Sequence, residues 1–115
     1  MKHMSQLSQK CLMAVLIAGA VCIVSLPLRS APASGADTYK AKCAMCHGQD
    51  GKGQTPMGLK FKIRDLSSAD VQKQSDAELT AVINNGKPPM PGYAKTLSAA
   101  EIRDLVAYIR TLAKS

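Results

Sequence analysis

Residues 43–47 read C-A-M-C-H, and this short stretch holds the residues of the chain best suited to chemistry. Cys43 and Cys46 are three positions apart, so on a helix their thiols lie on one side, one turn apart. His47 follows directly and can point its imidazole at a group held by both thiols. The C-x-x-C-H spacing is typical of haem c attachment, in which two thiols add to the two vinyl groups on one porphyrin edge. We therefore predict one covalent haem, bound through two thioethers, with His47 on the iron.

Three other interpretations of the cysteine pair are less well supported. A thioredoxin-like dithiol needs a β-α-β pattern around C-x-x-C, and no strand pattern precedes Ala36. A structural zinc site needs four Cys or His ligands, whereas this stretch offers three within one turn. A disulfide between Cys43 and Cys46 would close a very small loop and would stabilise the fold little. The sequence favours haem over all three.

The iron of such a haem needs a second axial ligand on its other face. His47 is the only histidine after residue 33, which excludes a second imidazole, and methionine is the natural alternative. Met45 lies between the two thiols and cannot reach the opposite face, and Met57 follows His47 by only ten residues. Met90 lies further along, in a P-P-M-P-G loop whose prolines restrict the backbone. We predict His47 and Met90 as the two iron ligands.

The first part of the chain has the order of an export signal. Residues 1–10 are polar with two lysines, residues 11–28 are apolar, and a run of small residues follows. This order predicts a secretory signal peptide over residues 1–33, cleaved after Ala33 or alternatively after Ala36. The apolar run is also about long enough to act as an uncleaved membrane anchor, which stays an alternative.

Residues 34–115 then form the mature domain, and its charge is modest. Without the leader's Lys2, Lys10 and Arg29, twelve basic residues remain against eight acidic ones, a net charge of about +4. Such a charge can steer acidic partners, but the lysines are spread out and no aromatic platform accompanies them, so nucleic acid is a poor fit. We expect a monomer in the periplasm. A thylakoid lumen or a membrane-anchored form is the alternative, and membrane contact requires an uncleaved leader.

Hydrophobic periodicity predicts an all-α domain with three main helices. They cover residues 36–47, residues 76–85 and the segment from residue 98 to the C-terminus, and serine–x–x–glutamate pairs typical of helix N-termini precede the second and third. The third has one apolar stripe, made of Ile102, Leu105, Val106, Ile109 and Leu112. Residues 48–74 and 86–96 are rich in glycine and proline, and we expect long loops there, with a short helical turn near residues 68–72. Long loops in so small a domain indicate a wrapped ligand, here the haem.

Three stretches of the chain together resemble a known family. They are YKAKCAMCHGQDGKG (39–53), SDAELTAVINNGKPPMPGY (75–93) and LSAAEIRDLVAYIRTL (97–112). They resemble class I cytochromes c, the small bacterial monohaem group, in the family's order along the chain. The resemblance implies the cytochrome c fold, a haem wrapped by a few helices. It also implies that the N- and C-terminal helices interlock, with Gly35 and Tyr39 meeting Leu105 and Tyr108.

The resemblance further implies a proline whose carbonyl accepts a hydrogen bond from the iron-bound histidine. By position this residue is Pro56, within T-P-M-G rather than the family's usual glycine–proline pair. Such a contact would orient the His47 ring and raise its basicity. We therefore include Pro56 among the predicted haem-binding residues.

A haem iron with both axial positions filled favours electron transfer over catalysis. We therefore predict a soluble single-electron carrier and no enzyme. Its donor would be a dehydrogenase or cytochrome complex, and its acceptor an oxidase or reductase. An open-site enzyme or gas-binding haem protein is the second hypothesis, and a dedicated subunit of one redox enzyme is the third. Candidate docking lysines are Lys52, Lys60, Lys62, Lys87 and Lys95.

Overall fold

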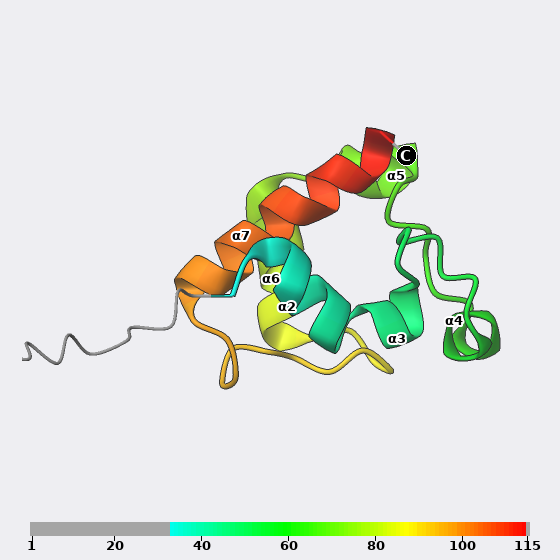
Figure 1. Cartoon of the computed structure of the whole chain (residues 1–115), viewed down its shortest axis with the longest axis horizontal. Helices are drawn as coiled ribbons and strands as arrows, with labels where there is room; N and C mark the ends of the chain where they lie inside the picture. The colour runs from blue at the N-terminus through cyan, green and yellow to red at the C-terminus, as the bar shows by residue number, and fades with distance from the viewer. Residues whose placement is uncertain (1–32, 115) are drawn as a thin grey trace, which may run out of the picture. The chain divides into compact units, whose positions relative to one another are not determined.

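The computed structural model describes residues 33–114, which fold into helices joined by loops (Figure 1). In chain order the elements are α2 (Gly35–Lys42), α3 (Ala44–His47), α4 (Pro56–Phe61), α5 (Ala69–Gln72), α6 (Asp76–Asn85), α7 (Ala99–Thr111) and a 3-10 turn (Leu112–Lys114). No strand occurs within these residues, where Lys87 and Met90 form an isolated bridge. The predicted all-α class is therefore confirmed. The predicted signal peptide lies outside the described residues, apart from Ala33.

The helices differ from the sequence-based expectation at two places. The first predicted helix is divided at Cys43 into α2 and α3, whereas the helical turn predicted near residues 68–72 is present as the four-residue helix α5. Helix α4 was not predicted, because its segment is short and lies among glycine and proline residues. None of the helices in residues 33–114 has the length and apolar character needed to cross a membrane.

The predicted helix N-termini are capped by reciprocal hydrogen bonds. At α6, the Ser75 hydroxyl accepts from the Glu78 backbone N–H at 3.1 Å, and the Glu78 carboxylate accepts from the Ser75 backbone N–H at 2.7 Å. Ser98 and Glu101 form the same pair at α7, at 3.2 and 2.8 Å. Each exchange satisfies N–H groups that a helix start leaves without partners. Both capping boxes are therefore confirmed.

The core is built where α7 crosses α2 (Figure 1). Gly35 lies so close to α7 that a Cβ there would overlap the backbone carbonyl of Asp104 and approach the Leu105 nitrogen. Further along, the Tyr39 ring packs on the Tyr108 ring, with centroids 5.1 Å apart. Tyr39 and Leu105 are almost fully buried. The predicted meeting of the two terminal helices at these residues is confirmed.

A second set of contacts joins the segment before α6 to α7. The Arg110 guanidinium donates to the Gln72 carbonyl at 2.8 Å and to the Asp76 carboxylate at 2.7 Å. The Gln72 amide donates in turn to the carbonyls of Leu66, at 2.7 Å, and Ile109, at 3.1 Å. These contacts fasten the segment before α6 to the C-terminal helix.

Candidate functional site

The C-A-M-C-H stretch lies at the joint between α2 and α3. Cys43 ends α2 by donating its N–H to the Tyr39 carbonyl at 2.8 Å, and its own carbonyl accepts from His47 N–H at 2.9 Å. The three functional side chains are therefore held on one turn of helix, as the spacing predicts. Cys43 belongs to the buried core and Cys46 is half-buried. Both are free thiols, so the disulfide interpretation is not realised.

The backbone that carries His47 is fixed from outside the stretch. Three consecutive carbonyls accept hydrogen bonds: Cys46 from Thr55 Oγ1 (2.6 Å), His47 from Gly53 N–H (2.7 Å) and Gly48 from the Tyr39 hydroxyl (2.7 Å). Gly48 has a φ of +81°, and this positive angle turns the chain sharply after the histidine. The result is a histidine whose main chain cannot shift without breaking contacts to α2 and to the loop before α4.

The side chains of this turn fit a covalently held haem. The Nδ1 atom of His47 is buried and has no hydrogen-bond partner within the described residues. A buried polar atom without a partner is rare in proteins, and a bound cofactor at this ring would explain it. Burial lowers the pKa of His47, so the ring is neutral at neutral pH and can bind a metal. Burial, with a smaller contribution from Cys46, raises the pKa of the Cys43 thiol to about 11.

The residues of this turn do not complete a zinc site. A structural zinc site needs four Cys or His ligands, and this turn offers three. Across residues 33–114, no three His, Cys, Asp or Glu side chains gather to hold a metal ion. Haem c attachment adds each thiol across a vinyl group: the sulfur bonds to one carbon and the proton goes to the other, so no further group has to leave. The residues present therefore fit haem c.

For Pro56 the structure shows no hydrogen bond to His47. The Nδ1 atom of His47 has no partner within residues 33–114. Pro56 is the first residue of α4, and carbonyls at a helix start point along the axis toward N–H groups four residues on. Its neighbour Thr55 makes the contact to the haem-binding turn instead, through Cys46. A haem contact by Pro56 stays a prediction.

Met90 lies on a short hairpin that folds back on α6. Its N–H donates to the Lys87 carbonyl at 2.8 Å and its carbonyl accepts from Lys87 N–H at 3.1 Å, enclosing the two prolines between them. Beyond it, Tyr93 N–H donates to the Ile83 carbonyl at 2.8 Å. A Cβ at Gly92 would lie 2.6 Å from the Asn84 carbonyl, so only glycine permits this close return. The hairpin thus holds Met90 with little backbone freedom.

The three methionines of residues 33–114 differ in their surroundings. Met90 is half-buried and packs against the buried core. Met45 is 78% exposed and Met57 is 38% exposed. A ligand on the far side of a buried haem has to be held inside the fold, so the packing favours Met90, as the sequence did.

Crossed terminal helices and a single C-x-x-C-H turn define a small c-type cytochrome. Residues 30–109 match the family described as "Cytochrome C oxidase, cbb3-type, subunit III". The chain belongs to this family of cytochrome c domains.

Individual relatives agree with this assignment. The chain is 33% identical to "Cytochrome c6" of Rippkaea orientalis, over 84% of each protein. It is 38% identical, over 71% of its length, to "Alcohol dehydrogenase (quinone), cytochrome c subunit" of Gluconacetobacter polyoxogenes, but spans only 19% of that relative. The solved structure "KustC0563 c-type cytochrome" superposes with a TM-score of 0.64 at 32% identity, covering 70% of this chain and 98% of that one.

These findings confirm the class I cytochrome c resemblance, the cytochrome c fold, haem c with its iron as cofactor, and electron transfer as the function. Some relatives are named as subunits of dehydrogenase or oxidase complexes. The sequence did not reveal three hydrogen bonds to the backbone in or beside the haem-binding turn: from Tyr39 to Gly48, from Thr55 to Cys46 and from Tyr93 to Lys42. Of these three residues, only Tyr39 could have been found from the sequence, because it lies one helical turn before Cys43.

Proposed function

We propose that the mature protein is a soluble one-electron carrier whose haem iron is bound by His47 and Met90. The observation that supports this most directly is the contrast among its methionines. Of the three methionines in residues 33–114, Met90 alone packs against the core, on a hairpin held by its exchange with Lys87. When bound, the haem supplies an iron that alternates between the ferric and ferrous states. The chain's part is to hold both ligands still, so that little rearrangement accompanies the change of charge.

The contacts of the turn support this role for His47. Its carbonyl and those of its two neighbours accept hydrogen bonds from separate parts of the chain. Its pKa is lowered by burial, so the ring is available to iron without first losing a proton. With both axial positions filled, the protein would carry electrons rather than catalyse a reaction. Some relatives are named as subunits of redox enzymes. A second candidate is therefore electron transfer as a dedicated subunit of one dehydrogenase or oxidase.

We also propose export to the periplasm with cleavage of the leader after Ala33. The fold supports this cut over one after Ala36. Ser34 caps α2 through a reciprocal exchange with Asp37, and Gly35 packs on α7 at Asp104. A cut after Ala36 would remove both, whereas a cut after Ala33 leaves them in place. The mass of the mature protein, or its N-terminal sequence, distinguishes the two sites.

The partners we propose are a dehydrogenase or cytochrome complex as donor and an oxidase or reductase as acceptor. The charge of residues 33–114 supports acidic partners, because the acidic side chains are largely engaged within the fold. Ion pairs join Asp70 to Lys73, Asp76 to Arg110 and Asp104 to Arg103. Asp37, Glu78 and Glu101 cap helices. The positive sign of the surface comes from the excess of twelve basic over eight acidic residues after residue 33.

The deciding experiment is an absorption spectrum of the exported protein, together with two methionine variants. The wild type should show sharp c-type bands when reduced and a weak far-red methionine–iron band when oxidised. Met90→Ala should keep the haem but lose the far-red band, bind carbon monoxide in the reduced state, and lower its midpoint potential within the roughly 0.8 V range that axial ligands set. Met57→Ala is the control and should change none of these. The opposite pattern would assign the ligand to Met57.

A further inference from the structure

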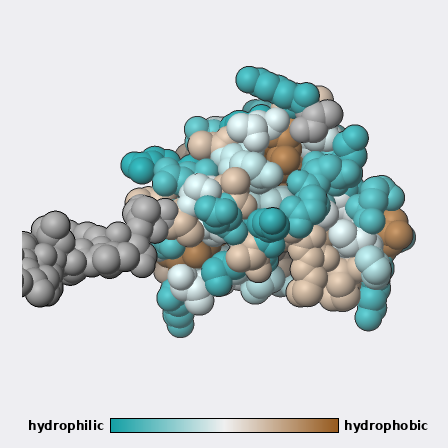
Figure 2. Space-filling model, viewed as in Figure 1, coloured by the Kyte–Doolittle hydropathy of each residue, from teal (hydrophilic) through white to brown (hydrophobic). Residues whose placement is uncertain are grey.

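Four large apolar side chains are exposed in the part of the chain that the structure describes, and all four belong to α3 and α4. They are Met45 (78% exposed), Met57 (38%), Leu59 (63%) and Phe61 (39%). Single exposed apolar residues are common, but a group confined to one place indicates a binding surface. Figure 2 shows apolar surface over α3 and beside α4, bordered by hydrophilic side chains.

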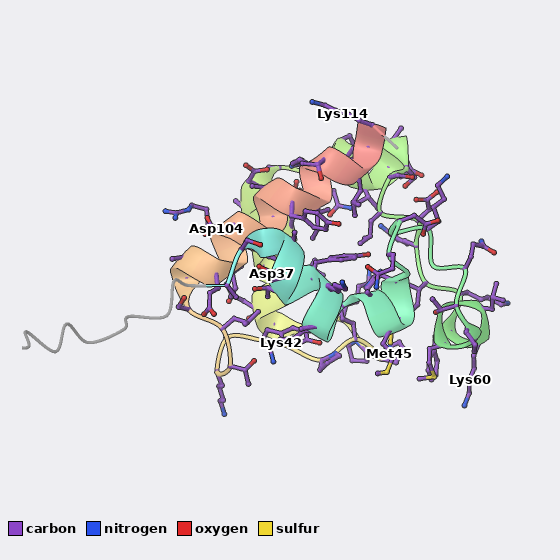
Figure 3. The ribbon with its side chains drawn as sticks, in the orientation of Figure 1. Asp37, Lys42, Met45, Lys60, Asp104 and Lys114 are labelled. Atoms are coloured by element: carbon purple, nitrogen blue, oxygen red, sulfur yellow. The ribbon has the colours of Figure 1, made fainter. Side chains whose placement is uncertain are left out.

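A bound haem could not cover this whole group. On α4, Met57 and Phe61 are four residues apart and share one side of the helix, whereas Leu59 lies two positions from each, on the other side. Covering the first pair would leave Leu59 facing outward. Met45 also lies between the two thiols on the outer side of its turn, and Figure 3 shows its side chain projecting toward the same edge as that of Lys60. From this spacing we infer that part of the group would stay exposed in the haem-loaded protein.

The charge around these side chains is of one sign. Residues 51–64 contain no acidic residue, and the ion pairs of the described chain involve none of the basic side chains in this range. Lys60 and Lys62 flank Phe61, and the Lys60 ammonium lies 5.3 Å from the centre of its ring. An apolar surface with unpaired lysines on its border is complementary to an apolar surface bordered by carboxylates.

Helix α4 is also tied directly to the haem-binding turn. Thr55 Oγ1 donates to the Cys46 carbonyl at 2.6 Å and accepts from Gly58 N–H at 2.9 Å, so one side chain caps α4 and fastens it to the turn. Gly58 lies so close to Gly53 that a Cβ there would overlap the Gly53 carbonyl. A protein seated on α4 therefore lies beside the covalent attachment point, where an electron would have a short path.

We propose that α4 and the adjoining side of α3 form the docking face for the redox partner. This face consists of Met45, Met57, Leu59, Phe61, Lys60 and Lys62. The partner would present an apolar patch bordered by Asp and Glu. A second copy of this chain fits poorly, since a symmetric contact would bring Lys60 and Lys62 of both copies together. This inference rests on the proposed electron-carrier function and names where on the molecule the transfer partner binds.

The test uses the haem-loaded protein on gold coated with a mixed monolayer of carboxylate- and methyl-terminated thiols, as a probe of an acidic, apolar partner. Lys60→Glu with Lys62→Glu is compared with Lys40→Glu plus Lys114→Glu, at two exposed lysines outside this face, which changes the net charge equally. We expect the first variant to lose about tenfold in adsorption and in interfacial electron-transfer rate, and the second to change far less. Leu59→Ser should weaken adsorption to the mixed monolayer but not to a purely carboxylate one.

Equal losses in the two charge variants would overturn the proposal, because general charge would then explain adsorption. Retention of wild-type adsorption by Leu59→Ser would overturn its apolar part. Binding to anionic phospholipid vesicles that depends on Leu59, without any effect on the monolayer, would assign the face to a membrane. Self-association that Leu59→Ser abolishes would assign it to a second copy. If the wild type shows no reversible redox chemistry, the electron-carrier function is wrong. The adsorbed mass of each variant would still test the docking face.

Discussion

The Tyr93 hydroxyl donates a hydrogen bond to the backbone carbonyl of Lys42, 3.2 Å away. Tyr93 follows Met90 by three residues, and Lys42 directly precedes Cys43. One side chain therefore joins the methionine hairpin to the haem-attachment turn, across 51 residues of sequence. A contact made within the protein thus joins the two halves of the proposed iron site.

Removing this hydroxyl should loosen the methionine ligand without disturbing haem attachment. Tyr93→Phe keeps the ring but loses one hydrogen bond, at a cost of about 1 kcal/mol. We expect the far-red methionine–iron band of the oxidised protein to disappear at a lower urea concentration than in the wild type. Tyr108→Phe is the matched control, because the Tyr108 hydroxyl makes no hydrogen bond within residues 33–114. Equal loss in both variants would contradict a specific role for Tyr93.

The crossing of α2 and α7 should not tolerate a side chain at Gly35. In Gly35→Ala the added methyl would overlap the Asp104 carbonyl, so the helices must separate. We expect a loss of roughly 1–3 kcal/mol in the free energy of unfolding, as for other overpacked contacts. Urea unfolding of the haem-loaded protein measures it. Ala36→Ser, one residue on and exposed, should cost much less.

The cap of α7 predicts a specific dependence of stability on acid. Hydrogen bonds from the Ser98 backbone and hydroxyl hold the pKa of Glu101 below its usual 4.5. Since the folded pKa is lowered, the stabilisation is present above about pH 4.5 and is lost as pH falls through the folded value. Glu101→Gln should therefore be less stable at pH 7 and should lose less between about pH 5 and pH 3.

Urea midpoints across this pH range measure the difference between wild type and Glu101→Gln. Asp104→Asn makes the same change of charge on the same helix but outside the cap. It should leave the acid dependence close to that of the wild type. If both variants flatten the profile equally, general charge rather than the cap is responsible.

Each cysteine should be separately necessary for full haem retention. Cys43→Ala and Cys46→Ala each remove one of the two thiols, leaving at most one thioether. We expect haem staining after denaturing electrophoresis to weaken or vanish in both variants and to vanish in the double variant. Met45→Ala lies between them and is largely exposed, so it should stain like the wild type. Full retention in both single variants would refute the attachment site.

Local sequence patterns predicted much of the fold, and the elements that they did not predict depend on contacts between distant residues. The two serine–glutamate caps and the stripe on α7 depend on residues within one or two turns, so spacing alone predicted them. Helix α4 escaped prediction because it is six residues long and too short to be stable by itself. Contacts from Thr55 to Cys46 and from Gly58 to Gly53 hold it, and no local pattern encodes them.

The candidate site divides in the same way. The sequence by itself determined the covalent chemistry, because Cys43, Cys46 and His47 must act within one helical turn and their spacing is local. Only the tertiary structure showed that Met90 packs against the buried core and that Pro56 is the first residue of α4. Those outcomes depend on where distant segments pack against one another. Packing is set by the crossing of α2 and α7 and by the folded-back hairpin, which sequence spacing does not describe.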